Sequence, residues 1–226
     1  MDNDCQKKNI SSQVKSIRQV VYDTLKELIL TGAVSPGEHL REREIAANFS
    51  VSTTPVKEAL RRLEQEGLVM TKPRRGTYVS SRISDFMEEV SWARSALEGV
   101  AARLAAIKIS DAEIEELRAQ LEEMQRYTRE GNAEKLVELN ERFHLRIRDI
   151  AKNDYVEQQI SAVRDFDRVV RKQALSNPEE LERAYREHRF IFERIAERDP
   201  DGAEEAMRSH IRRTAGFVKT MKGSDR

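Results

Sequence analysis

Apolar side chains recur every three or four residues between Ser50 and Val69, a spacing that predicts a helix with one apolar face. The apolar positions are Val56, Ala59, Leu60 and Leu63. Lys57, Arg61 and Arg62 fall outside this face, where cationic side chains can meet phosphates or base edges. The segment therefore predicts a helix that packs with one face and contacts DNA with another.

The residues before this helix predict how it starts and what supports it. Ser52, Thr53 and Thr54 place hydroxyl groups at the helix start, where free backbone N–H groups favour an N-cap and also a phosphate. Pro55 fits the first turn, because the N–H group that it lacks has no intrahelical partner there. We expect a short helix from Glu42 to Phe49 to support the longer one across a tight turn, as in a helix-turn-helix unit.

Two short β-prone runs follow the helix. They are Leu68–Thr71 and Gly76–Ser80, and Lys72-Pro-Arg-Arg75 joins them. The sequence therefore predicts a basic β-hairpin, which would form a wing beside the helix-turn-helix unit.

Beyond residue 80 the pattern becomes almost wholly helical. Ser80–Ser84 is a polar joint, and six helices are expected after it, at Asp85–Ile107, Asp111–Glu130, Ala133–Lys152, Tyr155–Ala174, Pro178–Arg198 and Asp201–Met221. Their short connections favour antiparallel packing. The predicted fold class is mainly α, with a winged helix-turn-helix domain over residues 1–80 and an antiparallel all-helical bundle over residues 81–226.

Charge and composition agree with this organisation. Residues 1–80 carry 13 basic and 10 acidic side chains, whereas the remaining residues carry 27 and 30, as expected for a basic module that faces DNA. No apolar run approaches the roughly 20 residues of a membrane span, and no leader sequence opens the chain, so we expect a soluble cytoplasmic protein. The single cysteine, Cys5, excludes a disulfide framework and a thiol metal cluster and is interpreted as incidental.

Three of the four histidines lie within apolar stripes of separate predicted helices, so all three are expected to face the core. The stripes are Leu136, Val137, Phe143, Ile147 and Ile150 around His144; Leu181, Tyr185, Ile191, Phe192 and Ile195 around His188; and Ala206, Met207, Ile211, Phe217 and Val218 around His210. A buried imidazole costs free energy unless it is hydrogen-bonded or binds a ligand. Any one of them alone is more often a hydrogen-bonded core residue, but three in one bundle favour a metal ion.

The ligand types indicate which metal ion this would be. Three neutral imidazoles and one oxygen donor suit a divalent ion such as Zn²⁺ or Ni²⁺, with coordination positions left open. Asn140 lies one helical turn before His144 and offers that oxygen. The predicted metal ligands are therefore Asn140, His144, His188 and His210.

Several ordered motifs between Leu28 and Ser80 resemble the winged helix-turn-helix domain of GntR-type bacterial transcription regulators. They are Gly32-Ala-Val-Ser-Pro-Gly37, Leu40-Arg-Glu-Arg-Glu-Ile-Ala46, Val51-Ser-Thr-Thr-Pro-Val-Lys-Glu-Ala-Leu60 and Arg75-Gly-Thr-Tyr-Val79. The resemblance implies DNA contacts at Arg43, Ser52, Thr53, Thr54, Lys57 and Gly76, to which the exposed helix face adds Arg61. The family usually has arginine at the positions of Thr53 and Lys57. Without these planar guanidinium groups, the operator need not follow the usual half-site.

The helical region resembles the FCD-type effector domain of the FadR subfamily. The matching motifs are Arg94-Ser-Ala-Leu-Glu-Gly-Val-Ala-Ala-Arg-Leu-Ala-Ala106, Phe143-His-Leu-Arg-Ile147 followed by Asn153, Glu187-His188 and Ser209-His210. The resemblance implies a ligand set of one aspartate and three histidines; Asn140 replaces the aspartate, so weaker metal binding is expected. It also places Arg94 where an arginine clamps an effector carboxylate. The alternative role of Arg94 is an intrahelical ion pair with Glu98.

Two classes of function are compatible with these features. The leading one is a ligand-responsive regulator: a homodimer binds double-stranded DNA at a pseudo-palindromic operator, and a small carboxylate or sugar acid binds at the metal. The alternatives are a metal-dependent hydrolase or lyase with a DNA-binding appendage, and a metal-free dimerisation bundle. No acidic residue adjoins His144 or His210 on its inward face, and Glu187 points about 100° away from His188 around the helix. The absence of a general base therefore favours a regulator over an enzyme.

Overall fold

The computed structural model describes residues 15–224, without the side chains of Ser84, Arg164, Asp165, Asp167 and residues 218–224. The predicted roles of Cys5 and of the Val218 side chain lie outside the described residues. The chain divides into two compact units, residues 1–83 and 84–226. No helix of the described chain is long and apolar enough to cross a membrane.

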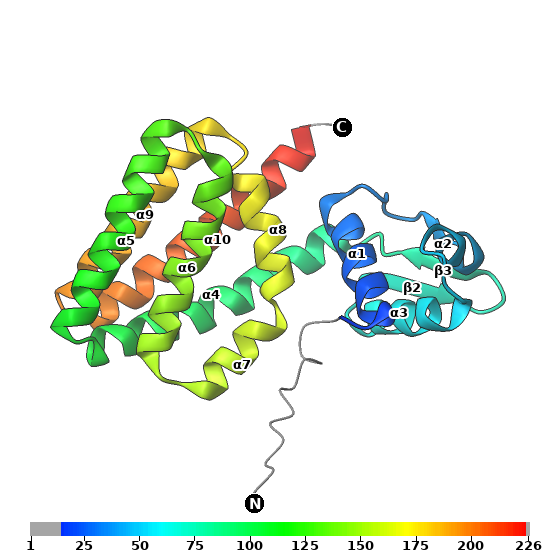
Figure 1. Cartoon of the computed structure of the whole chain (residues 1–226), viewed down its shortest axis with the longest axis horizontal. Helices are drawn as coiled ribbons and strands as arrows, with labels where there is room; N and C mark the ends of the chain where they lie inside the picture. The colour runs from blue at the N-terminus through cyan, green and yellow to red at the C-terminus, as the bar shows by residue number, and fades with distance from the viewer. Residues whose placement is uncertain (1–14, 225–226) are drawn as a thin grey trace, which may run out of the picture. The chain divides into compact units, whose positions relative to one another are not determined.

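The first unit consists of helices and a small antiparallel sheet (Figure 1). Its elements are α1 (Ile17–Thr31), β1 (His39–Leu40), α2 (Glu42–Asn48), α3 (Thr53–Gln65), β2 (Val69–Lys72) and β3 (Gly76–Val79). The strand order is β1-β3-β2, and Lys72 pairs with Gly76 at the turn between β2 and β3. Helices α2 and α3 and the β2–β3 hairpin form the predicted winged helix-turn-helix fold.

Helix α1 and strand β1 are the elements of this unit that the sequence analysis left unassigned. Ser16 caps the start of α1 by accepting a hydrogen bond from the backbone N–H of Gln19, and Gly32 ends the helix at φ +83°. Leu25 and Ile29 are buried, and α1 packs against α3. Helix α1 therefore covers the apolar face of the helix that was expected to contact DNA.

The second unit is a helical bundle, and its described residues form one helix more than predicted. The helices are α4 (Ile83–Lys108), α5 (Asp111–Glu130), α6 (Ala133–Ala151), α7 (Asp154–Ala162), α8 (Arg164–Ala174), α9 (Pro178–Ala196) and α10 (Pro200–Ser224). The predicted local signals fix several ends: Ser110 and Glu113 form a capping box, and Gly131 ends α5 in a left-handed conformation.

The prediction of a single helix from Tyr155 to Ala174 is wrong, because the chain bends at Val163 into α7 and α8. The two helices bury their apolar residues in different places. Val156 and Ile160 of α7 pack in a cluster with residues of α4, whereas α8 packs in a cluster that contains residues of α4 and α10. Tertiary packing therefore explains a bend that neither glycine nor proline marks in the sequence.

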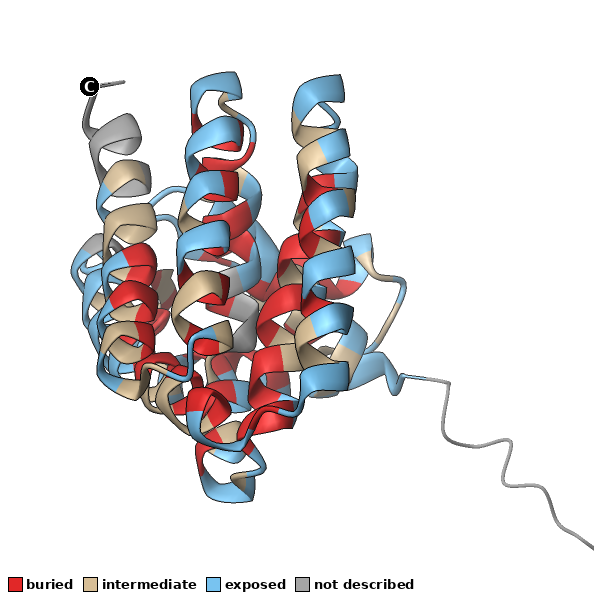
Figure 2. Ribbon diagram, turned by 90° about the vertical axis from the view of Figure 1, so that its left-hand side faces the viewer, coloured by how far each residue is buried: buried red, intermediate tan, exposed pale blue. Residues whose placement is uncertain are grey.

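Buried residues follow the inward faces of the bundle helices (Figure 2). The main core includes Ala102, Leu117, Leu121, Phe143, Ile147, Ile191, Ile195, Met207 and Ile211. Helix α5 packs against α6 and α9, and α9 packs against α10. This packing brings α6, α9 and α10, which carry the three histidines, around one core.

Candidate metal centre and nucleic-acid interface

His144 on α6, His188 on α9 and His210 on α10 converge in the bundle core. Each imidazole is at least 95% buried, and one potential ligand atom from each ring lies within 4.8 Å of the other two. The Nε2 atoms of His144 and His188 are 3.4 Å apart. Phe143 packs edge-on against His188, with 5.1 Å between the ring centroids, so hydrocarbon borders the cluster.

Hydrogen bonds from the Nδ1 atoms orient two of these imidazoles, those of His188 and His210. His188 Nδ1 donates to the carbonyl oxygen of Ala184 at 2.6 Å, and His210 Nδ1 donates to Glu187 Oε2 at 2.8 Å. Each bond places the proton on Nδ1 and leaves the Nε2 lone pair for another partner. Metal-binding histidines in proteins are held in this way.

The protonation of His188 suits the same role. Burial lowers the pKa of His188 well below its usual value, and the neighbouring rings of His210 and His144 lower it further. His188 is therefore neutral at neutral pH, which is the form that binds a metal ion.

No acidic residue adjoins His144 or His210 on the inward face of its own helix, but carboxylates from other helices reach both. Glu98 Oε2 on α4 lies 3.6 Å from His144 Nδ1, and Glu187 on α9 accepts the hydrogen bond from His210. Both carboxylates are also paired with arginines: Glu98 accepts from Arg94, and Glu187 accepts from Arg213.

These pairings determine what the carboxylates can do. Burial alone would raise the pKa of Glu187, but hydrogen bonds from His210 and Arg213 outweigh it and the pKa is lowered. Glu187 thus stays ionised and is committed to orienting its neighbours. A carboxylate with a lowered pKa is a weak base, and contacts with His210 and Arg213 already occupy its oxygens.

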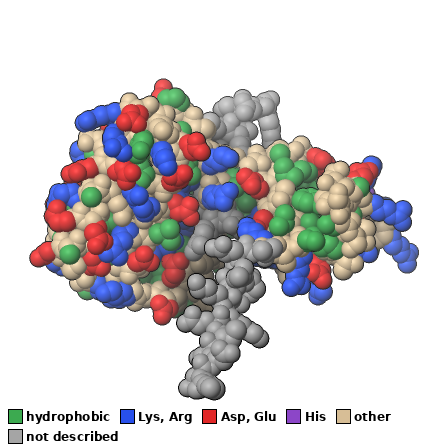
Figure 3. All heavy atoms as spheres, viewed as in Figure 1, with side chains coloured by type: hydrophobic (Ala, Val, Ile, Leu, Met, Phe, Trp, Pro, Cys, Tyr) green, Lys and Arg blue, Asp and Glu red, His purple; other side chains and the backbone are tan. Residues whose placement is uncertain are grey.

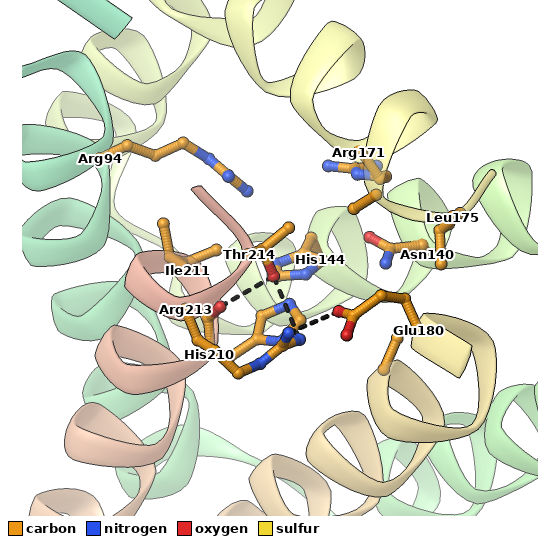
Figure 4. Close-up of a pocket in the computed structure, with 12 residues that line it drawn as sticks. Arg94, Asn140, His144, Arg171, Leu175, Glu180, His210, Ile211, Arg213 and Thr214 are labelled. Atoms are coloured by element: carbon orange, nitrogen blue, oxygen red, sulfur yellow. Dashed lines mark hydrogen bonds and ion pairs between the residues drawn. The ribbon is translucent and has the colours of Figure 1, made fainter. Parts of the chain in front are cut away.

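His144 and His210 border a small cavity, shown in Figure 4 with residues that line it. Asn140 Oδ1 is buried and has no hydrogen-bond partner among the described residues. Arg94 makes the expected ion pair with Glu98, with 3.2 Å between Nη2 and Oε1, and lines the cavity as well. The two roles considered for Arg94 are therefore compatible.

Further cavity residues escaped the sequence analysis. Arg171 on α8 and Arg213 on α10 also line the cavity, and so does Glu180 on α9. No spacing in the sequence relates these helices, so only the fold brings the side chains together.

The cavity is small. Its volume is about 20 Å³. A single water molecule needs about 10–15 Å³ on this measure, so the space suits an ion or a water molecule but not a carboxylate of several atoms.

The predicted DNA contacts lie mostly on the surface of the first unit. Arg43, Ser52, Thr54, Lys57 and Arg61 are exposed, whereas Thr53 and Gly76 are partly exposed. Ser52 occupies the N-cap position of α3, but its side chain makes no capping hydrogen bond, which leaves the hydroxyl available. Lys57 Nζ lies 3.7 Å from Glu42 Oε2, a pairing that costs little to break at the surface.

Arg62 is exposed and lies off the apolar face of α3, as the helix pattern predicted, but it also contacts α1. Its guanidinium lies 3.7 Å from the centre of the Tyr22 ring and donates to Gln19 Oε1 at 2.9 Å. Arg62 therefore joins α3 to α1.

The wing presents basic side chains around a constrained turn. Lys72, Arg74 and Arg75 are exposed, and Figure 3 shows Lys and Arg side chains at the β2–β3 end of this unit. Gly76 has φ +97°, and a Cβ atom there would lie 2.3 Å from His39 Nε2. Glycine is therefore required at position 76 by the backbone and by the neighbouring ring.

Two family models match the chain and cover most of it. The model described as bacterial regulatory proteins, gntR family, matches residues 17–79, and the FCD domain model matches residues 89–213. The chain is 29% identical to the uncharacterised HTH-type transcriptional regulator YdhC of Bacillus subtilis, over 88% of this chain and 89% of that protein. It is 28% identical to the HTH-type transcriptional repressor RspR of Escherichia coli, over 91% and 90%.

A solved structure agrees with these matches at the level of the fold. The E. coli McbR/YncC structure aligns with a TM-score of 0.63 at 21% identity and covers 92% of this chain and 100% of that one. The resemblance that the sequence motifs indicated is confirmed by the family models. The chain therefore belongs to the gntR family of bacterial regulatory proteins, carries an FCD domain, and is a DNA-binding transcription regulator rather than an enzyme.

Proposed function

We propose that this regulator responds to a small carboxylate or sugar acid through a divalent metal ion, Zn²⁺ or Ni²⁺, held by His144, His188 and His210. Asn140 would be the fourth donor, since its buried oxygen has no other partner among the described residues. The ion would supply open coordination positions for an effector carboxylate. The observation that carries the proposal is the convergence of three buried imidazoles from three helices.

Arg94 is the proposed partner of the effector. It lines the same cavity as Asn140, His144 and His210, and a guanidinium can bind a carboxylate with two hydrogen bonds. Because the cavity holds only about 20 Å³, an effector must displace lining side chains or helices in order to enter. A ligand that binds only the enlarged form shifts the population toward that form, which is the physical basis proposed for the response.

The proposed DNA interface consists of Arg43, Ser52, Thr53, Thr54, Lys57, Arg61 and Gly76, with residues 1–80 as the DNA-binding domain. Residues 81–226 would bind the effector and form a homodimer, and two winged units would then meet the two halves of a pseudo-palindromic operator. Support comes from the exposure of the basic residues on α3 and from the basic wing.

Metal removal tests the proposal. We expect the purified protein to contain the ion by elemental analysis, and a chelator to lower its thermal unfolding midpoint. A ligand at about 100 times its Kd stabilises the folded state by ~2.7 kcal/mol. For a chain of this size the corresponding shift is roughly 5–10 °C.

The metal-free protein, reloaded with Zn²⁺ or Ni²⁺, should regain the higher midpoint. A chain that purifies without metal, binds neither ion and keeps its midpoint in chelator would contradict the metal site. The histidines would then be a hydrogen-bonded core, and effector binding would rest on Arg94 alone.

A further inference from the structure

The three histidines differ in the group that lies next to Nδ1, the ring nitrogen that would not bind the metal ion. His188 Nδ1 donates to a backbone carbonyl of its own helix, that of Ala184. His144 Nδ1 lies 3.6 Å from the nearest Glu98 oxygen, beyond hydrogen-bond distance. His210 Nδ1 donates to a carboxylate at hydrogen-bond distance, 2.8 Å from Glu187 Oε2. The orientation of His210 therefore depends on a charged side chain.

Glu187 is itself held in place. Arg213 Nη2 donates to the same oxygen, Oε2, at 2.6 Å, and Arg213 Nε forms an ion pair with the other oxygen, Oε1. Arg213 Nη1 donates to Glu180 Oε2 at 2.6 Å. Figure 4 shows Arg213 beside His210 and Glu180 at the cavity. A continuous set of polar contacts therefore runs from His210 through Glu187 to Arg213, which lines the cavity.

We propose that Glu187 is a positioning residue for the metal ligand His210, and that Arg213 connects it to the effector cavity. Glu187 keeps the proton of His210 on Nδ1 and the ring turned with Nε2 toward His144 and His188. This inference rests on the proposed metal site. It assigns a role to a residue that the sequence placed off the inward face of α9.

The chemistry of an imidazole explains why the hydrogen bond between His210 and Glu187 affects metal binding. A neutral histidine carries its proton on one nitrogen only, and the tautomer with hydrogen on Nε2 cannot bind a metal through that atom. Without a fixed acceptor at Nδ1, His210 would be free to adopt that tautomer or to rotate. Loss of the hydrogen-bond partner of a metal-binding histidine typically weakens metal binding about 10–100-fold.

The variant Glu187→Gln tests the role without changing side-chain volume. Both His210 and Arg213 donate to Oε2 of Glu187. An amide offers one oxygen and one NH₂ group, so it cannot accept from all the donors that meet the two carboxylate oxygens. We expect Co²⁺, titrated into metal-free protein and followed by its visible absorption, to bind about 10–100-fold more weakly than to the wild type.

Glu204→Gln is the matched control. Glu204 has the same side-chain exposure as Glu187, 25%, and also accepts hydrogen bonds from arginines, Arg103 and Arg208, but it does not line the cavity. Both variants lose a partly buried carboxylate that is paired with arginine, so both should lower the unfolding midpoint of the metal-free protein. Only Glu187→Gln should weaken Co²⁺ binding and change the Co²⁺ spectrum. Equal weakening in the two variants would overturn the proposal.

A second measurement needs no variant. In metal-free wild type labelled with ¹⁵N-histidine, nitrogen chemical shifts should show the proton of His210 on Nδ1, and a proton on Nε2 would contradict the proposal. The failures are distinguishable. If the wild type binds no metal ion, the proposed function fails. If the wild type binds Co²⁺ and Glu187→Gln binds it equally well, only the role of Glu187 fails.

Discussion

Asn140 determines how much negative charge the candidate metal centre can supply. Imidazole and amide ligands bring no negative charge to offset a divalent cation. We therefore expect Asn140→Asp to bind metal more tightly than the wild type. Two unit charges 4 Å apart attract by about 1–4 kcal/mol between bulk water and a protein surface, so the gain should be roughly tenfold or more.

Competition with a chromophoric chelator measures this difference directly, because Asn and Asp have nearly the same volume. Asn132→Asp is a suitable control, since Asn132 caps the start of the same helix, α6, and lies on the surface. It adds the same charge far from the cavity. A metal affinity that rises in neither variant would remove Asn140 from the ligand set.

Individual residues also show how far the sequence could anticipate the site. The apolar stripes around His144, His188 and His210 were sufficient to predict that the three side chains are buried. Their carboxylate partners could not be predicted, because Glu98 reaches His144 from another helix and Glu187 reaches His210 across the α9–α10 contact. Periodicity describes one helix at a time and carries no information about which side chains meet between helices.

Among the elements, α3 is the one proposed to read DNA, and Lys57 tests it. Lys57→Ala should weaken operator binding by about 1–3 kcal/mol if the side chain contacts a base, and should relax specificity at one symmetric position. A phosphate contact would instead weaken binding to all sequences alike. Fluorescence anisotropy with the operator and with single-base variants separates the two cases.

The control for this experiment is Lys135→Ala, which removes an exposed lysine from α6 in the other unit. Its affinity for DNA should match that of the wild type. If Lys57→Ala binds every sequence as tightly as the wild type does, α3 is not the reading helix.

The elements were predicted best where local signals were strong. The apolar face of α3, the basic turn of the wing and the capping box of α5 all act within a few residues, and these elements lie where the sequence placed them. Strand β1 is two residues long and exists only through its pairing with β3. The bend at Val163 likewise follows from packing against different helices, so no local pattern could have shown it.

At the scale of the whole molecule, the proposed homodimer makes a prediction about stoichiometry. One winged unit covers one half-site, so a pseudo-palindromic operator should bind two chains. Native mass spectrometry of the protein with an operator selected from random duplexes should show two chains per duplex. A duplex in which one half-site is replaced serves as the control and should bind more weakly. A saturated complex that contains one chain would contradict the dimeric arrangement.

The small volume of the cavity, about 20 Å³, has a consequence for how the effector concentration that triggers a response can evolve. If the proposed effector binds only an enlarged form, its apparent Kd equals the intrinsic Kd divided by the fraction of molecules in that form. That fraction depends on how tightly α8, α9 and α10 pack around the cavity. Substitutions among these packing residues can therefore retune the concentration at which a regulator responds, while every residue that touches the effector stays the same.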